Sequence, residues 1–485
     1  MLLSDLLVAD VTAPSTAAAI AITGITADSR AVQPGFLFAA LAGSRTDGAR
    51  FVADAVAKGA AAILAGEGVT IDAPTQVPVL RAREPRRALA RMAARFHPRQ
   101  PAHMLAITGT SGKTSVADFT RQILTALGEQ AASLGTIGLV RPDGAVYGSL
   151  TTPDPVSLHA TLDGIAADGI THVAFEASSH GLDQFRLDGV RVTAAAYTNL
   201  GRDHLDYHPT LDAYLAAKLR LFAELLPADG TAVVNADGAE AAHVVDIVQR
   251  RGIRCLTTGQ LGDTLRLVEA TREGFDQRIV VRADGRDHAL TFPLLGGYQI
   301  ENALVAAGLA IACDLPADAA LGALEHLHGV AGRLEIVARH NGGLAVVDYA
   351  HKPEALAAAL DALRPFATGK LICIIGCGGD RDRGKRPIMG RIAVDRADVV
   401  IVTDDNPRSE NPAFIRSEIL ANASGAREIG DRGAAIAGGI ALLGEGDVLL
   451  VAGKGHETGQ IVGDKTYPFS DHEAVQAAIE GKAYG

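Results

Sequence analysis

The segment TGTSGKTS, residues 108–115, constrains the fold of this chain more than any other feature of its sequence. It follows the apolar run MLAIT and opens the helical pattern SVADFTRQILTAL, so the sequence predicts a strand, a glycine loop and a helix in that order. In this context the backbone N–H groups near Gly109 and Gly112 can converge on phosphate oxygens. Lys113 supplies a cation for the β- and γ-phosphates, and the hydroxyl of Thr114 can bind Mg²⁺. The loop therefore predicts nucleotide binding.

The loop is shorter than the common phosphate-binding pattern, whose first glycine would fall at Ile107. An ordinary strand-to-helix turn is the alternative interpretation. A phosphate loop also does not name a reaction, because kinases, GTPases, motors and ligases all use one.

The rest of the chain predicts an α/β protein of three domains. A length of 485 residues allows about three domains at roughly 150 residues each. The strands HVAFEA, AAAYTNL and GTAVVNA alternate with helices after the glycine loop, which predicts a mostly parallel sheet in the central domain, whereas residues 263–295 have the alternation of antiparallel strands. We place the domains at residues 1–88, 89–328 and 329–485, and expect the last to be a second α/β domain.

In the last domain, three apolar strands end in polar, reactive residues. They are KLICIIGCGGDRD, DVVIVTDDNPR and DVLLVAGKGHE. Ligands of open α/β sheets bind beyond the carboxyl ends of the strands, so these three ends predict one shared site.

Composition excludes several classes of protein. The net charge is −11, from 45 Lys and Arg against 56 Asp and Glu, which argues against a general binder of nucleic acid or anionic membranes. No window holds 18 apolar residues without a charge, and the segment MLLSDLLVADVT lacks the basic start of a signal peptide, so we expect a cytoplasmic protein. The four cysteines form no disulfide framework and show no pairwise zinc spacing.

The shortened loop, the segments EASSHGLDQFR and NLGRDHLDYH, and Lys218 together resemble the Mur ligase family. Further matches cover the whole chain in one order: ADSR, LTTPD, GGYQIEN, GRLE, DYAHKPEA, GGDRDRGKRP, DDNPR and GKGHE. One departure is Ser111, where the family usually has Asn. The resemblance implies a UDP-binding first domain, a central ATPase domain and a Rossmann-like last domain, in agreement with the predicted domains.

The resemblance also implies the reaction. Members of the family form amide bonds at the expense of ATP and extend the peptidoglycan precursor. This chain looks most like the members that add meso-2,6-diaminopimelate to UDP-N-acetylmuramoyl-L-alanyl-D-glutamate through an acyl phosphate. The expected partners are these small molecules, without nucleic acid or membrane, and the family suggests a monomer.

The resemblance carries functional roles onto individual residues. The implied catalytic residues are Lys113, Glu176, His204 and Lys218. The implied Mg²⁺ ligands are Thr114, Glu176, His204 and Lys218, the last carbamylated by CO₂ to N6-carboxylysine, because a protonated lysine would repel the ion. ATP is expected on Gly109, Thr110, Ser111, Gly112, Lys113, Thr114, Ser115, Asn302, Arg333 and Asp348. The UDP-muramoyl dipeptide is expected on Ala27, Ser29, Ser44, Arg45, Thr46, Thr151, Thr152, Ser178, Gln184 and Arg186. Diaminopimelate is expected on Arg381, Asp405, Asn406, Pro407, Arg408, Gly453 and Glu457.

The choice of amino acid follows from charge. Diaminopimelate differs from lysine by a second carboxylate, which Arg408 can grip bidentately while Arg381 adds a second guanidinium and Glu457 accepts from an ammonium. Lysine would leave an arginine unpaired in a desolvated pocket, which is costly. In the family, the DNPR motif accompanies diaminopimelate addition.

Other readings stay open from the sequence. Folylpolyglutamate synthetase shares the loop and the carbamylated lysine but lacks DNPR, and the dipeptide-adding Mur ligase shares the fold but not GGDRD with DNPR. A phosphate-loop kinase or switch would not need three polar strand ends in a second α/β domain. A purely structural or interaction protein is the remaining class.

Overall fold

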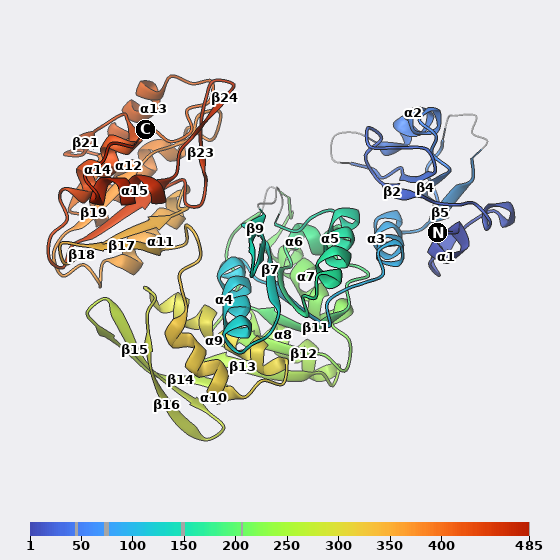
Figure 1. The fold of residues 1–485 in the computed structure, drawn as a ribbon, viewed down its shortest axis with the longest axis horizontal. Coiled ribbons are helices and arrows are strands. Elements are labelled where there is room, and N and C mark those ends of the chain that lie inside the picture. Colours follow the sequence, from blue (N-terminus) through green and yellow to red (C-terminus); the bar gives the residue numbers. More distant parts are fainter. Residues whose placement is uncertain (44–46, 72–76, 147–150, 205–206, 485) are drawn as a thin grey trace. The chain divides into compact units, whose positions relative to one another are not determined.

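The structure is a computed structural model that describes residues 1–43, 47–71, 77–146, 151–204 and 207–484. The chain forms two compact units, and Figure 1 shows its helices and strands coloured along the sequence. The first comprises Met1–Leu265 and Val305–Pro316, and the second comprises Arg266–Leu304 and Ala317–Gly485. The predicted α/β class is confirmed, while the predicted domain boundaries stay predictions.

The first unit begins with a five-stranded sheet in the order β1-β5-β4-β3-β2. Its strands are β1 (Val11–Thr12), β2 (Gly24–Thr26), β3 (Phe36–Ala39), β4 (Ala62–Gly66) and β5 (Val79–Ala82). All neighbours are parallel except β1 and β5. Helices α1 (Leu3–Leu6) and α3 (Pro85–Phe96) bury apolar side chains against one face of this sheet, and α2 (Val52–Ala57) buries them against the other.

The larger sheet of the first unit carries the glycine loop. The strands β13-β12-β11-β6-β10-β7 run parallel in that order, and β8 and β9 continue the edge antiparallel. Their bounds are β6 (His103–Thr108), β7 (Ala131–Gly135), β8 (Gly138–Arg141), β9 (Gly144–Val146), β10 (His172–Glu176), β11 (Val192–Tyr197), β12 (Thr231–Asn235) and β13 (Arg254–Gly259). The helices are α4 (Lys113–Ala126), α5 (Pro155–Ala167), α6 (Ser179–Asp183), α7 (Leu211–Arg220) and α8 (Ala241–Arg250). Strands buried on both faces explain the continuous apolar runs of the sequence.

The second unit starts with the predicted antiparallel strands, which are confirmed as β14 (Leu265–Glu273), β15 (Asp276–Ala283) and β16 (Arg286–Phe292). Helix α9 (Gly297–Ala312) follows, and its last turns belong to the first unit. Helix α10 (Ala317–Gly322) comes next along the chain.

A six-stranded sheet in the order β17-β18-β22-β19-β20-β21 forms the centre of the second unit. Only β17 is antiparallel to its neighbour. Helices α11, α12 and α13 cover one face, and α14 and α15 cover the other (Figure 1). The strands are β17 (Glu335–His340), β18 (Gly343–Asp348), β19 (Leu371–Ile375), β20 (Val399–Val402), β21 (Arg427–Glu428) and β22 (Val448–Ala452), with the hairpin β23 (Gly459–Val462) and β24 (Lys465–Pro468). The helices are α11 (Pro353–Leu363), α12 (Lys385–Arg396), α13 (Pro412–Leu420), α14 (Arg432–Ile440) and α15 (Asp471–Ile479).

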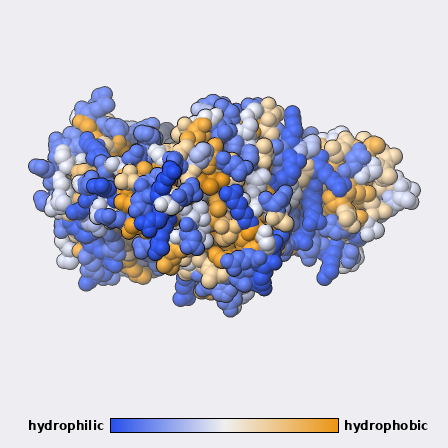
Figure 2. Space-filling model, turned by 90° about the horizontal axis from the view of Figure 1, so that it is seen from below, coloured by the Kyte–Doolittle hydropathy of each residue, from blue (hydrophilic) through white to orange (hydrophobic). Residues whose placement is uncertain are grey.

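Hydrophobic residues appear on the molecular face in Figure 2 as separate patches among hydrophilic ones. Within the described residues, no helix is long and apolar enough to cross a membrane.

Candidate active site

The phosphate loop lies between β6 and α4, as the sequence predicts. Gly109 has a φ of 146°, and a Cβ on it would lie 1.9 Å from Thr198 Oγ1, so only glycine fits this turn. The N–H of Ser111 donates to Asn199 Oδ1 at 3.0 Å, and Lys113 Nζ donates to the carbonyl oxygens of Gly109 and Thr110, each at 2.9 Å. The strand end after β11 therefore fixes the loop, including the position of Ser111.

Glu176 lies at the end of β10 beside the loop, with only 2% of its surface exposed. Its Oε1 accepts from Thr114 Oγ1 at 2.9 Å and from the N–H of Thr136 at 2.7 Å. A Cβ on Gly135 would lie 2.1 Å from the same oxygen, so the neighbouring strand needs a glycine to admit this carboxylate. The two predicted ligands of a first metal ion, Thr114 and Glu176, are thus brought together as hard oxygen donors.

Lys218 on α7 is buried, with 1% exposure, although a helical lysine is usually solvated. Its Nζ donates to the carbonyl oxygen of Gly109 at 2.7 Å and lies 4.1 Å from the centroid of the Tyr214 ring. Burial, and secondarily the charge of Lys113, lower the pKa of Lys218 to about 6. The amine is therefore mostly neutral near pH 7.

His204 is the remaining predicted ligand, and its φ of 53° places it in the left-handed region. Its ring packs edge-on against the rings of Tyr214, at 6.2 Å between centroids, and His180, at 4.8 Å. His204 and Lys218 therefore both contact Tyr214. A strained backbone at a polar residue of this kind is typical of functional sites.

Five of the residues predicted to bind the UDP-muramoyl dipeptide form one hydrogen-bonded group around Glu176. Thr152 Oγ1 donates to the carbonyl oxygen of Glu176 at 2.8 Å and accepts from Ser178 Oγ at 2.9 Å. Arg186 donates to the carbonyl oxygen of Thr152 at 2.7 Å and to Gln184 Oε1 at 2.7 Å. Thr151 Oγ1 lies 3.1 Å from Thr136 Oγ1, so it joins the same group.

A cavity of about 930 Å³ extends this group toward the first sheet of the same unit. Its lining includes the predicted residues Ala27, Ser29, Gln184 and Arg186, together with Arg86 at the start of α3. Burial lowers the pKa of Arg186, since desolvation penalises the charged guanidinium. An anionic ligand in the cavity would compensate that cost. The predicted residues Ser44, Arg45 and Thr46 lie outside the described residues.

The three predicted adenosine-side residues outside the loop gather in the second unit. Asn302 is buried and donates to Gln299 Oε1 at 3.1 Å, rather than facing solvent. The Arg333 guanidinium lies 5.4 Å from the centroid of the Tyr349 ring. Asp348 accepts from the N–H of Leu334 at 2.7 Å, and burial raises its pKa to about 6.

The residues predicted to bind the amino acid converge at the carboxyl ends of β19, β20 and β22, so the three strand ends meet as expected. Asn406 donates through Nδ2 to Glu457 Oε2 at 2.8 Å. Asp405 lies against Gly453, where a Cβ would be 2.6 Å from Asp405 Oδ2. Arg408 NH1 donates to the carbonyl oxygen of Gly379 at 2.9 Å.

Arg408 follows Pro407 with a φ of 51°, a conformation that is strained for a residue with a Cβ. Its N–H donates to the carbonyl oxygen of Ile461 at 3.0 Å, and its own carbonyl accepts from the N–H of Gly463 at 2.7 Å. The β23–β24 hairpin therefore holds the backbone in place. Arg381 is exposed, and its NH1 donates to the carbonyl oxygen of Asp380 at 3.2 Å.

Sequence reasoning missed three basic residues at these sites. Lys454 is fully buried and donates to Asn406 Oδ1 at 3.1 Å, to Glu457 Oε2 at 3.3 Å and to the carbonyl oxygen of Gly459 at 2.6 Å. Arg432 is 1% exposed and is paired with Asp471 at 2.7 Å. Arg86 is the third. The motif GKGHE contains Lys454 and could have identified it, but no local sequence pattern indicates a role for Arg432 or Arg86.

Models of known protein families match three segments that together cover most of the chain. The Mur ligase middle domain matches residues 107–310, the Mur ligase glutamate ligase domain matches residues 332–455, and the Mur ligase family catalytic domain matches residues 21–97. The chain therefore belongs to the Mur ligase family, as the sequence motifs indicated, and it is an ATP-dependent ligase that forms amide bonds.

The relatives narrow this class. A protein of Bradyrhizobium diazoefficiens named UDP-N-acetylmuramoyl-L-alanyl-D-glutamate--2,6-diaminopimelate ligase is 57% identical, over 99% of this chain and 100% of its own. A protein of the same name from Brucella melitensis is 55% identical over 97% of this chain and 96% of its own. A solved structure with that name has a TM-score of 0.72 at 32% identity, covering 95% of both chains. The MurF ligase of Thermotoga maritima in complex with ADP shares the fold, with a TM-score of 0.60 at 18% identity over 96% of this chain and 98% of its own.

Proposed function

We propose that this chain adds meso-2,6-diaminopimelate to the D-glutamate of UDP-N-acetylmuramoyl-L-alanyl-D-glutamate at the expense of ATP. The observation that carries the proposal is the group of Arg408, Asn406 and Glu457 at one sheet edge of a chain that is 57% identical to a diaminopimelate ligase. The group offers a guanidinium for a carboxylate and a carboxylate for an ammonium. Arg381, on the neighbouring strand end, supplies the second guanidinium that a substrate with two carboxylates needs.

The proposed reaction has two steps. The γ-carboxylate of D-glutamate attacks the γ-phosphorus of ATP, ADP leaves, and an acyl phosphate forms. The amine of diaminopimelate then attacks the acyl carbon, a proton leaves the nitrogen, and phosphate departs as the amide forms. In the first step a carboxylate approaches the negatively charged γ-phosphate, so charge neutralisation and positioning dominate the rate of this step. Lys113 supplies one positive charge at the loop, and Arg186 with Gln184 orients the dipeptide from the adjoining cavity.

The donor set beside the loop fits Mg²⁺. Thr114 Oγ1 and Glu176 Oε1 lie 2.9 Å apart, and hard oxygens are the ligands that this ion prefers. Bound there, Mg²⁺ would neutralise charge on the transferring phosphoryl group. The hydrogen bond of Thr136 to Glu176 keeps the carboxylate turned toward Thr114.

Lys218 fits the proposed carbamylation. CO₂ adds only to a neutral amine, forming a carbamate anion and releasing one proton. Burial supports this step, because desolvation, with the charge of Lys113 second, lowers the pKa of Lys218 to about 6. The carbamate would provide two oxygen donors for a second Mg²⁺ together with His204.

The amino-acid specificity is tested by a substrate panel. Phosphate release from ATP is measured with the UDP-muramoyl dipeptide and, in turn, with meso-diaminopimelate, lysine, D-alanyl-D-alanine or glutamate. Turnover with meso-diaminopimelate at least about 100-fold above lysine is expected, because lysine leaves the Arg408 guanidinium unpaired. Equal turnover with lysine would reject the specificity.

The same proposal assigns residues 1–88 to UDP binding, 89–328 to ATP hydrolysis and 329–485 to the amino acid. The proposal also includes a cytoplasmic location, a monomeric state and small-molecule substrates. Light scattering of the purified protein tests the monomer, and a dimer at micromolar concentration would contradict it.

A further inference from the structure

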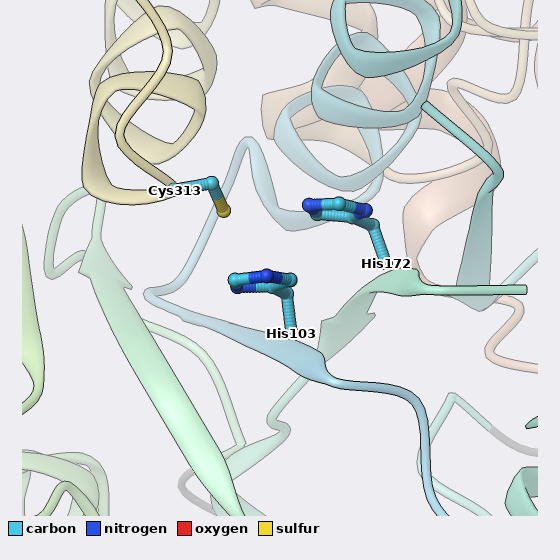
Figure 3. Close-up of side chains that lie close together, drawn as sticks. All are labelled: His103, His172 and Cys313. Carbon is cyan, nitrogen blue, oxygen red and sulfur yellow. The ribbon is translucent and has the colours of Figure 1, made fainter. Parts of the chain in front are cut away.

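Two histidines and a cysteine meet at the end of the larger sheet opposite to the phosphate loop. His103 and His172 are the first residues of β6 and β10, and they face each other in the parallel register. Paired residues of neighbouring strands point to the same face of a sheet. Their rings therefore stack, with 4.3 Å between centroids and 7° between planes (Figure 3).

Cys313 closes this group from another part of the chain. It follows α9 directly, in the segment Val305–Pro316 that returns to the first unit. Its sulfur points toward the two rings in Figure 3, and one ligand atom from each of the three residues lies within 4.8 Å of the others. His172 is buried, while His103 and Cys313 are half-buried, so the group is accessible from solvent on one side.

The Nδ1 atom of His172 has the kind of hydrogen-bond partners that support metal-bound histidines. His172 Nδ1 lies 2.8 Å from Thr171 Oγ1 and 3.5 Å from a carboxylate oxygen of Glu129. The Glu129 carboxylate can only accept, which favours a proton on Nδ1, and Thr171 Oγ1 can accept from that N–H while it donates to the carbonyl oxygen of Gln130 at 3.2 Å. This tautomer leaves the lone pair of Nε2 free, and a hydroxyl or carboxylate on the other nitrogen is the usual support of metal-bound histidines.

From this geometry we propose that His103, His172 and Cys313 form a binding site for a zinc-class divalent cation that clamps the segment after α9 to the first residues of β6 and β10. Two imidazole nitrogens and one thiolate match the ligands that Zn²⁺ and Co²⁺ prefer and that Mg²⁺ does not. The thiol proton is released to solvent on binding. Solvent supplies the fourth ligand.

Binding requires a small rearrangement. Ligand atoms around tetrahedral zinc stand roughly 3.3–3.7 Å apart, from bond lengths of about 2.0–2.3 Å, so the three residues must close by about 1 Å. Because the two rings are stacked almost parallel, the lone pairs of their nitrogens lie parallel to each other and do not converge on one point. Rotation of the half-buried His103 ring turns its nitrogen toward the point shared with His172 and Cys313.

The site is separate from the catalytic residues. Along β6 the phosphate loop follows His103 by about five residues, and along β10 Glu176 follows His172 by four, which is roughly 13–16 Å at 3.3 Å per residue. The inference therefore does not rest on the proposed function, and its test does not use turnover.

The test is a Co²⁺ titration of the full chain after chelator treatment and removal of the chelator. We expect one equivalent of Co²⁺ to produce a sulfur-to-cobalt charge-transfer absorption that excess Mg²⁺ does not reduce. Cys313→Ser should abolish this absorption, and Cys255→Ser, which changes another half-buried free cysteine of the same unit, should keep it. An absent band, or one that persists in Cys313→Ser, would overturn the proposal.

A second measurement guards against misfolding of the serine variant. Zn²⁺ should slow alkylation of Cys313 at least about tenfold in the wild-type chain, and His103→Gln, which leaves the thiol intact, should lose this protection. Zn²⁺ should also raise the melting temperature of the wild-type and Cys255→Ser chains but not that of His103→Gln. Equal protection of Cys313 in His103→Gln would reject the histidine as a ligand.

Discussion

Replacement of Lys218 by methionine tests the catalytic proposal most directly. The side chains are similar in length, so the packing against Tyr214 is largely kept while the amine is lost. With a pKa of about 6, the neutral amine of Lys218 outnumbers the ammonium by about 30 to 1 at pH 7.5, whereas a lysine at 10.5 is neutral in about one molecule in 1000. Burial therefore gives Lys218 the neutral amine that the proposed carbamylation requires.

Under this proposal, replacing Lys218 would remove an anionic metal ligand and with it several kcal/mol of charge stabilisation. We expect kcat to fall on the order of 1000-fold in Lys218→Met, since each 1.36 kcal/mol is a factor of about ten. ADP formation that depends on all three substrates is the assay. Lys482→Met, at an exposed lysine that pairs with Glu480, is the control and should keep wild-type turnover.

Two further readouts separate carbamylation from a structural role. Acetate should partly restore activity to Lys218→Ala by occupying the space of the carbamate, and ¹³C-bicarbonate should give a carbamate resonance in the wild-type chain that Lys218→Met lacks. In CO₂-free buffer Lys218→Met should melt at a higher temperature near pH 7, because the unfolded lysine binds a proton between pH 6 and 10.5 and the folded one does not. Turnover of Lys218→Met within tenfold of the wild type would refute the reasoning.

Four other predictions concern single side chains. Arg408→Ala should raise KM for diaminopimelate at least about 100-fold while KM for ATP stays within twofold, because one partner of a charge pair is lost; an unchanged KM for the amino acid would contradict the receptor role. Lys454→Met should raise the same KM at least tenfold, since Glu457 and Asn406 lose their buried anchor, and an equal rise for ATP would indicate general disruption instead. Arg432→Met should lower the free energy of unfolding by about 3–5 kcal/mol by leaving Asp471 buried and unpaired, as measured by urea denaturation; a loss under 1 kcal/mol would contradict it. Burial lowers the pKa of His159 to about 4, so the unfolded chain gains a proton before the folded one and stability should fall by on the order of 3 kcal/mol as the pH drops from 6.5 to 4; His159→Gln should flatten this slope, and an unchanged slope would exclude His159 as its cause.

The sequence by itself determined the elements and the class of chemistry. The strand, loop and helix around residues 103–126 follow from apolar spacing and glycines, which are local signals. The polar ends of β19, β20 and β22 could be predicted to meet, because the carboxyl ends of parallel strands lie at one edge of a sheet. The motifs in chain order then identified the family.

Only the tertiary structure decided which of these groups are desolvated and which distant residues meet. Lys218 becomes mostly neutral because the fold buries its amine and brings the charge of Lys113, 105 positions earlier, close to it. Lys454 anchors Asn406 from 48 positions away, and Cys313 reaches His103 and His172 only because the segment after α9 returns to the first unit. Burial and charge pairing depend on contacts between residues far apart in the sequence, and a local pattern of residues does not predict those contacts.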